Sequence, residues 1–294
     1  MSVIKGATIG MFDGVHLGHQ YLISQLKEHC DEAVAVTFTN HPLWVIKGER
    51  EPRLLSTPAE KSGLLGALDV RPVLLPFDGQ LRHMTAEEFI RMLAREHGID
   101  RLVLGFNNSI GSDRRTSDDD SALSNATGVE IIRATELPGD IKVNSSSIRE
   151  MVAAGDVKHA TALLGRNYTL NGTVVHGKKL GRTIGFPTAN IDVDSTDKLI
   201  PANGIYAADA TTTDGHAYRA VVNIGRRPTV DNPAAPVTIE AHLDGFTGSL
   251  YDQPLTLHFL DRLREEKKFD DLTSLQHQIE QDLICAKNFD EILR

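Results

Sequence analysis

The chain has 294 residues, enough for about two domains at roughly 150 residues each. Its 40% hydrophobic and 24% charged residues are typical of a globular protein and argue against a disordered chain. The net charge of -9 argues against a nucleic-acid-binding protein, which needs a basic face. No run approaches the ~18 apolar residues that a membrane helix needs, so we expect no membrane partner.

The two cysteines, Cys30 and Cys285, lie far apart and lack Cys-x-x-Cys spacing. They therefore indicate neither a disulfide scaffold nor a cysteine zinc site, and they suit a reducing compartment. The N-terminal segment has neither the apolar core nor the small-residue cleavage site of a secretory signal. We therefore expect a cytoplasmic protein.

Short apolar runs alternate with helical patterns in the first half of the chain. The expected strands are Val3 to Ile9, Ala33 to Phe38, Pro72 to Leu75, Leu102 to Leu104 and Val129 to Ile132. Gln20 to His29 has a helical pattern, and Thr85 with Glu88 forms a capping-box pattern before a second helix. This alternation predicts a parallel sheet covered on both faces, which binds ligands outside the carboxyl ends of its strands.

The second half changes to short strands separated by Asn-Gly and Asp-Gly turns. The expected strands are Thr173 to Val175, Tyr206 to Ala210, Ala220 to Ile224, Thr238 to Leu243 and Leu255 to Phe259. Their close spacing predicts an antiparallel sandwich or closed barrel. Leu272, Leu275, Ile279 and Leu283 then predict one amphipathic helix.

Two histidines flank a glycine where the first strand leads into a helix, in the run from Gly10 to His19. A helix N-terminus offers free backbone N–H groups and the positive end of the helix dipole, which favour phosphate. His16 and His19 can donate hydrogen bonds to that phosphate, and Gly18 lets it approach the backbone. The alternative is a pair of surface histidines in a glycine-rich turn. A metal site is disfavoured because no carboxylate or cysteine stands at ligand spacing.

A second glycine-rich segment runs from Gly172 to Asn190. It is not a P-loop, because Lys179 stands where that motif requires Ser or Thr, but a basic loop can still bind phosphate through backbone N–H groups. Thr188 and Asn190 are two residues apart on an extended chain, so they point to the same side. Their oxygens are hard ligands suited to Mg²⁺, although a polar strand end is the alternative.

Several further motifs occur in order along the chain. They are Thr37–Pro42, Leu104–Asn107, Ser145–Arg149, Gly185–Asn190, Pro201–Tyr206, Asn223–Thr229, Glu240–Leu243 and Leu263–Phe269. Together they resemble the bacterial bifunctional riboflavin kinase/FAD synthetase (FMN adenylyltransferase) family over nearly the whole chain. The resemblance implies a Rossmann-like α/β nucleotidyltransferase domain over residues 1–157. It also implies an antiparallel β-barrel kinase domain with a C-terminal helix over residues 158–294.

The resemblance also implies roles for residues of the first half. His16 and His19 contact ATP phosphates as catalytic residues. The expected nucleotide and phosphate contacts of this half are Gly10, Asp13, Gly18, Asn107, Ser145 and Arg149. Where the family has a Phe-x-Phe-Gly segment, this chain has Asn108 to Gly111, so both aromatic residues are absent. An alternative is therefore a riboflavin kinase whose first half is impaired in adenylylation.

For the second half, the resemblance implies ATP-dependent phosphorylation of riboflavin. Glu240 is the expected general base, Thr188 and Asn190 hold Mg²⁺ with ATP, and Arg264 contacts the flavin. The expected phosphate loop consists of Gly177, Lys178, Gly181 and Arg182. The substrates are riboflavin, FMN and ATP, and the oligomeric state stays open. A flavin-binding sensor without turnover is the remaining alternative, which a retained base beside a metal site disfavours.

Overall fold

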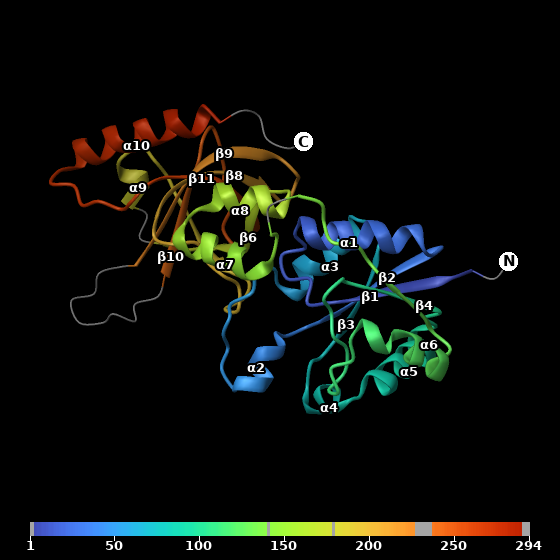
Figure 1. Ribbon diagram of the computed structural model, residues 1–294. Coiled ribbons are helices and arrows are strands. Elements are labelled where there is room, and N and C mark those ends of the chain that lie inside the picture. The colour runs from blue at the N-terminus through green and yellow to red at the C-terminus, as the bar shows by residue number, and fades with distance from the viewer. Residues whose placement is uncertain (1–2, 140–141, 178–179, 227–236, 290–294) are drawn as a thin grey trace. The chain divides into compact units, whose positions relative to one another are not determined.

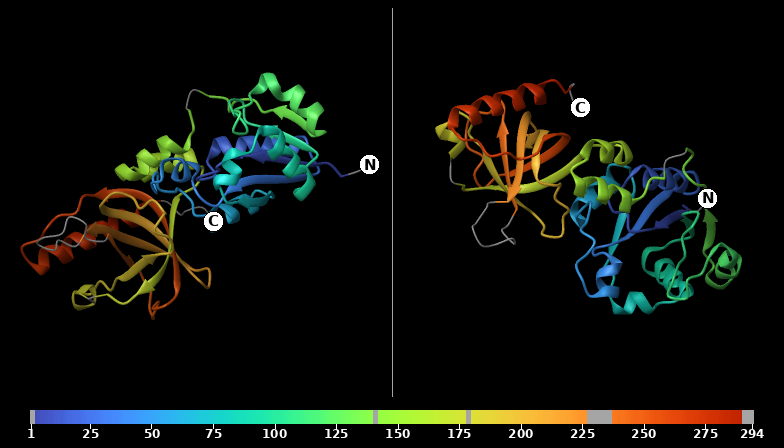
Figure 2. Two further views of the ribbon diagram at one scale, coloured as in Figure 1. Left: turned by 90° about the horizontal axis from the view of Figure 1, so that it is seen from below. Right: turned by 60° about the vertical axis from the view of Figure 1, so that its left-hand side comes forward.

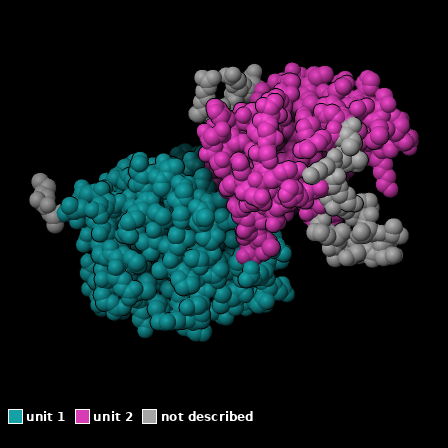
Figure 3. Space-filling model, turned by 180° about the vertical axis from the view of Figure 1, so that it is seen from behind, with its two compact units in different colours: residues 1–145 teal, residues 146–294 magenta. Residues whose placement is uncertain are grey.

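The computed structural model describes residues 3–139, 142–177, 180–226 and 237–289 (Figure 1). By its internal contacts the chain divides into two compact units, residues 1–145 and 146–294 (Figure 3). Two helices, α7 (Ser145–Ala154) and α8 (Val157–Leu164), follow this division, and α8 packs on barrel strands of the second unit. The division by contacts falls after residue 145, twelve residues before the expected domain boundary between residues 157 and 158. That boundary stays a prediction.

The first unit is built on a five-stranded parallel sheet with the order β3-β2-β1-β4-β5, as the alternation of strands and helices predicts. Its strands are β1 (Lys5–Ile9), β2 (Glu32–Phe38), β3 (Arg71–Leu75), β4 (Arg101–Leu104) and β5 (Glu130–Arg133). All five match expected strands to within a few residues. The chain leaves β1 toward β2 on one side, whereas β4 lies on the other, so the β1/β4 junction is the topological switch point.

Helices cover both faces of this sheet (Figures 1 and 2). The helices of this unit are α1 (Leu17–Glu28), α2 (Pro42–Lys47), α3 (Pro58–Gly66), α4 (Gly79–His83), α5 (Ala86–His97) and α6 (Asp120–Thr127), and α1, α3, α5 and α6 pack on the sheet. Alternate β2 residues divide between the faces, because Val34 and Val36 pack with α5 while Ala35 packs with α1 and α3. The expected capping box of Thr85 and Glu88 is present at the start of α5.

The second unit is a closed barrel of six antiparallel strands with the order β10-β7-β6-β11-β8-β9 (Figure 2). They are β6 (Tyr168–Val175), β7 (Ala189–Val193), β8 (Gly204–Thr212), β9 (Ala217–Arg226), β10 (Val237–Leu243) and β11 (Pro254–Arg264). The residue pattern did not single out β7, because Pro187 precedes it and its apolar residues are few. The barrel nevertheless closes only through β7, which joins β6 to β10.

The last helix, α10 (Leu272–Lys287), lies along the outside of the barrel against β8, β9 and β11 (Figure 1). The expected apolar stripe is only partly correct, since Leu283 is buried but Leu272 is 56% exposed. Ile279 packs beside Leu283 and Leu275 lines a cavity under the helix, so only Leu272 departs from the expected stripe, and Asp282 and Ala286 are buried beside it. A short helix, α9 (Leu180–Thr183), precedes β7. Residues of α9 and α10 line a cavity over the part of the outer barrel surface on which Glu240 lies.

Candidate functional site

The loop after β1 makes a sharp turn at the sheet's switch point. Phe12, Gly14 and Val15 all have positive φ angles (48°, 81° and 40°), and the side chains of Phe12 and Val15 are buried beneath the loop. A positive φ is unfavourable for a β-branched or bulky residue. The surrounding contacts therefore have to hold this backbone in place.

Asp13 supplies much of that support. Its carboxylate is fully buried and accepts hydrogen bonds from the backbone N–H groups of Leu55 (3.1 Å) and Ser56 (2.9 Å). The Gly14 N–H donates to the Ser56 hydroxyl at 2.9 Å, and the Ser145 hydroxyl donates to the Asp13 carbonyl at 2.9 Å. Two expected phosphate contacts, Asp13 and Ser145, thus hold the loop in shape. Whether they also contact phosphate stays a prediction.

Lys61 was not singled out from the sequence, because a lone lysine in an α3 pattern is usually exposed. It is 1% exposed here, and its Nζ donates to the carbonyls of Met11 (3.0 Å) and Phe38 (2.7 Å). It therefore ties the end of β1 to the end of β2. Burial lowers the pKa of Lys61 to about 8, while the nearby Asp13 carboxylate acts in the opposite direction.

His16 is the N-cap of α1, and its Nδ1 accepts a hydrogen bond from the His19 backbone N–H at 3.3 Å. An accepting Nδ1 carries no hydrogen, so in the neutral ring the N–H is on Nε2. The rings of His16 and His19 stack with their centroids 3.6 Å apart. The two imidazoles thus form one pair at a helix N-terminus, and their contact with phosphate stays a prediction.

A cavity of about 310 Å³ lies at this switch point and brings together His16, Gly18, His19 and Asn107. Phe106 lines the same cavity and is 57% exposed, a position that its place in the sequence did not predict. Of the two positions that lack the family's aromatic residues, Ile110 is buried in the core. The other, Asn108, donates to the Ile9 carbonyl at 3.3 Å. Phe106 therefore provides an aromatic surface beside the histidines.

Gly10 and Arg149 are the remaining expected phosphate contacts of the first half. Gly10 follows β1 directly, and its N–H donates to the Val36 carbonyl at 3.1 Å. Ser145 and Arg149 are four residues apart on α7, so they share one face of that helix. The direct contacts of Gly10 and Arg149 with phosphate stay predictions.

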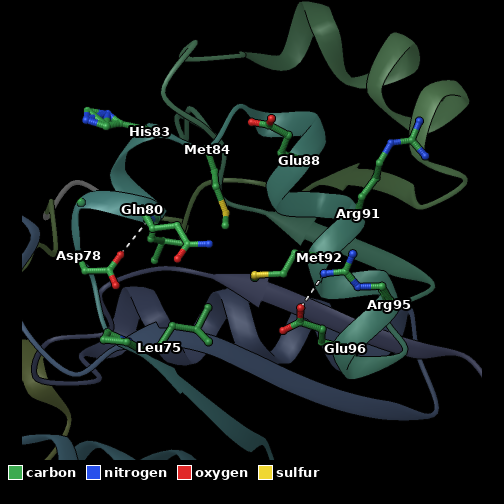
Figure 4. Close-up of a pocket in the computed structure, with 13 residues that line it drawn as sticks. Leu75, Asp78, Gln80, His83, Met84, Glu88, Arg91, Met92, Arg95 and Glu96 are labelled. Carbon is green, nitrogen blue, oxygen red and sulfur yellow. Dashed lines mark hydrogen bonds and ion pairs between the residues drawn. The ribbon is translucent and has the colours of Figure 1, made fainter.

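A larger cavity of the first unit lies elsewhere, beside α4 and α5 (Figure 4). It has about 810 Å³, and Figure 4 shows Met84, Met92 and Leu75 pointing into it. Arg95 on its rim is ion-paired with Glu96 at 2.8 Å. None of the expected phosphate contacts lines this cavity, so we place the candidate site in the smaller cavity beside the histidines.

In the second unit, strand register places four residues in one row across the outside of the barrel. Glu240 of β10 pairs with Asn190 of β7 on one side and with Asn223 of β9 on the other. Asn223 in turn pairs with Ile205 of β8. The Thr188 hydroxyl donates to Glu240 Oε2 at 3.3 Å. The structure thus brings the expected base beside both expected metal ligands.

A cavity of about 360 Å³ lies over this row and beneath α10. Most of its walls are apolar, and its polar lining includes Thr188, Asn223, Glu240, Arg264 and Glu266. Its apolar lining residues are Ile184, Phe186, Ile205, Val221, Phe269, Leu275 and Ile279. A cavity that combines apolar walls with several polar side chains, here also His242, Lys267 and Asp282, suits a small organic ligand.

Arg264 lines this cavity, but its guanidinium is also bonded to the buried Asp282 of α10. Its Nε lies 3.0 Å from Asp282 Oδ1, and a second guanidinium nitrogen lies 2.7 Å from Oδ2. This two-point contact ties α10 to the end of β11. Arg264 therefore has a structural task, and its expected contact with flavin stays a prediction.

The described residues of the expected phosphate loop lie close to Thr188, and Gly181 lines the cavity beneath α10 together with it. A side chain at Gly177 would clash with the Asn190 amide (2.2 Å), and one at Gly181 would clash with the Phe186 carbonyl (2.2 Å). Arg182 lines a smaller cavity of about 90 Å³, and Thr188 lines both this cavity and the larger one. Lys178 lies outside the described residues. Thr188 thus lines both cavities, one beside Gly181 and the other beside Arg182.

Comparison with known proteins gives matches over nearly the whole chain. An FAD synthetase family model matches residues 4–148, and a riboflavin kinase family model matches residues 164–289. The bifunctional riboflavin kinase/FMN adenylyltransferase of Pseudomonas fluorescens is 35% identical, covering 96% of this chain and 91% of its own. The protein of the same description from Bacillus subtilis is 34% identical, covering 93% and 89%.

Among solved structures, a Streptococcus pneumoniae protein described as a macrolide-efflux protein matches with a TM-score of 0.88. It is 30% identical, and the match covers 99% of this chain and 96% of that one. Within the described residues of this chain, every helix is too short or too polar to cross a membrane.

Proposed function

This chain belongs to the family of bifunctional riboflavin kinase/FMN adenylyltransferases, and we propose how its two units carry out the two reactions. The second unit phosphorylates riboflavin to FMN with ATP. The first unit then transfers AMP from ATP to FMN, which gives FAD and pyrophosphate. The pairing of Glu240 with Thr188 and Asn190 beside an apolar cavity is the observation that supports this proposal most strongly.

In the kinase reaction, Glu240 is the general base. The terminal hydroxyl of the ribityl chain is a poor nucleophile, so Glu240 accepts its proton as the oxygen attacks the γ-phosphorus of ATP. The bond from that phosphorus to the bridging oxygen breaks, and ADP leaves. The apolar cavity beneath α10 holds the flavin ring, which places the ribityl chain over the strand row.

The residues beside Glu240 fit a magnesium ion. Thr188 and Asn190 offer neutral oxygen donors, and within the described residues there is no cluster of three His, Cys, Asp or Glu side chains that would hold a metal alone. Mg²⁺ commonly takes few protein ligands and completes its shell with water and phosphate oxygens. We propose that Thr188 and Asn190 hold Mg²⁺ with ATP, where it would neutralise charge on the transferring phosphoryl group.

In the adenylylation reaction, a phosphate oxygen of FMN attacks the α-phosphorus of ATP, and pyrophosphate leaves. His16 and His19 at the N-terminus of α1 donate hydrogen bonds to the phosphates, and the helix dipole adds positive potential there. Gly18 lets phosphate approach the helix. We assign Asp13 to positioning this loop, because its carboxylate is enclosed by the 55–56 segment.

A single time course tests both assignments. Purified protein is incubated with riboflavin, ATP and Mg²⁺, and riboflavin, FMN and FAD are separated by chromatography. FMN should appear first and then convert to FAD. FMN that accumulates without FAD would contradict the adenylylation assignment, and unchanged riboflavin would contradict the kinase assignment. We also propose that the reactions take place in the cytoplasm, which agrees with two cysteines that form no disulfide.

A further inference from the structure

Asn223 is a polar residue that lines the apolar cavity. The kinase reaction proposed above assigns no role to its side chain. It lies on β9, directly across from Glu240 on one side and from Ile205 on the other. Asn190 occupies the opposite flank of Glu240. The carboxylate therefore stands between two carboxamides, one toward the phosphate loop and one toward the cavity beneath α10.

The Asn223 side chain carries an unmet hydrogen-bonding capacity. Its Oδ1 is buried and accepts no hydrogen bond from any residue that the structure describes. Buried carbonyl oxygens in folded proteins nearly always have a donor, so an exception calls for one from outside the chain. Because Asn223 also lines the cavity, a bound ligand with hydroxyl groups can supply that donor.

We propose that Asn223 recognises a secondary hydroxyl of the ribityl chain, next to the hydroxyl that is phosphorylated. This inference rests on the proposed kinase function of the second unit. The phosphoryl donor approaches Glu240 from the side of Thr188 and Asn190, so the polyol reaches Glu240 from the opposite side. Asn223 is the residue paired directly with Glu240 on that side, and side chains of directly paired residues typically lie about 4.5–5.5 Å apart, so two hydroxyls of one polyol chain can reach both side chains.

This role makes Asn223 a determinant of specificity for a polyol. A site with a buried amide aimed at a hydroxyl discriminates against substrates that lack it, because the amide is then left unpaired. The apolar walls recognise the ring, whereas Asn223 recognises the chain. A flavin with a plain alkyl chain would fill the same cavity but would offer no hydroxyl to the Asn223 side chain.

The test compares two substrates and two enzymes. The first substrate is riboflavin. The second is a flavin analogue in which a 5-hydroxypentyl group replaces the ribityl chain, so that the terminal hydroxyl is kept and the secondary hydroxyls are absent. ADP formation is measured for wild type and Asn223→Ala, with flavin binding followed by fluorescence. The matched control is Thr238→Val, which removes a hydroxyl from the same strand as Glu240 outside the cavity.

Asn223→Ala should lower kcat/KM for riboflavin about tenfold, the size of one neutral hydrogen bond, and leave the analogue within about twofold of wild type. Thr238→Val should not discriminate between the two flavins. An equal loss on both flavins would overturn the inference, because Asn223 would then only position Glu240. No loss on either would also overturn it. Failure of wild type to phosphorylate riboflavin would instead overturn the kinase function, and this inference with it.

Discussion

The Thr188 hydroxyl donates a hydrogen bond to the Glu240 carboxylate, with 3.3 Å between Oγ1 and Oε2. A hydroxyl that donates its hydrogen keeps its lone pairs free for a cation. The same contact orients the Glu240 carboxylate. Thr188 therefore contacts the proposed base while its oxygen can also serve the proposed metal site.

Glu240→Gln should abolish the kinase reaction and spare adenylylation. The amide keeps the shape of the side chain but cannot accept a proton, so ADP formation with riboflavin should fall about 10²–10⁴-fold. The side chain is only half-buried, so the free energy of unfolding should change by less than about 1 kcal/mol. FAD formation from added FMN serves as the internal control. A parallel loss of both activities would show a general structural defect instead.

His16 offers a way to separate capping from catalysis. His16→Asn keeps a good N-cap acceptor but removes the imidazole, whereas His16→Ala removes both. Both variants should lose FAD formation from FMN by about 10²–10³-fold, since one preorganised donor to the phosphates is gone. Only the Ala variant should also lose about 1 kcal/mol of stability, measured by urea unfolding. The prediction fails if His16→Asn retains full adenylylation.

Much of the fold could be predicted because its patterns are local. The β2 run alternates between two buried faces, and the Thr85 capping box marks the start of α5 in the sequence itself. The switch-point rule then places Asn107 beside His16, although the two are far apart in the chain. These predictions needed periodicity and a topological rule, and no detailed packing.

The remainder depends on register and burial, which a single segment does not reveal. Asn223 gains its place beside Glu240 only through the pairing of β9 with β10. Lys61 is buried only because two strand ends present carbonyls to it. Phe106 directly precedes Asn107, which the sequence predicts to contact phosphate. An aromatic residue next to an expected ligand contact was the only sign in the sequence that Phe106 lines the cavity.

Phe106→Ala should weaken substrate binding in the first unit with little effect on folding. The ring is 57% exposed, so its removal should change stability by less than about 0.5 kcal/mol. Loss of a stacking surface should raise the KM for FMN or ATP in adenylylation by about 3–10-fold. Val3→Ala, at another exposed apolar residue, is the matched control. Unchanged KM values for both substrates would exclude a stacking role.

Asp282→Asn distinguishes two roles of Arg264. If the ion pair chiefly ties α10 over the cavity, this change should destabilise the barrel by about 3 kcal/mol and raise the KM for riboflavin. If Arg264 chiefly contacts flavin, freeing its guanidinium should leave riboflavin affinity intact or improved. Riboflavin fluorescence titration and thermal unfolding measure the two effects, and we expect the first outcome. Adenylylation of FMN should be unaffected.

Lys61 should give the first unit a distinctive dependence on pH. Burial lowers its pKa from the ordinary 10.5 to about 8, so the folded state releases this proton before the unfolded state does. Below about pH 8 both states are protonated, and the cost of burying the charge is present in full. Between about pH 8 and 10.5 the unfolded state binds more protons, so stability rises with pH by on the order of 3 kcal/mol.

Lys61→Met isolates this effect, because all other titrating groups are shared. The variant should be less stable than wild type at pH 7, since it leaves the Met11 and Phe38 carbonyls without their donor. The deficit measured by urea unfolding should then grow as the pH is raised from 7 to about 10.5. A deficit that stays constant or shrinks over this range would mean that folding does not lower the pKa of Lys61. In that case the buried ammonium would be stabilised more by the two carbonyls and by Asp13 than it is destabilised by loss of water.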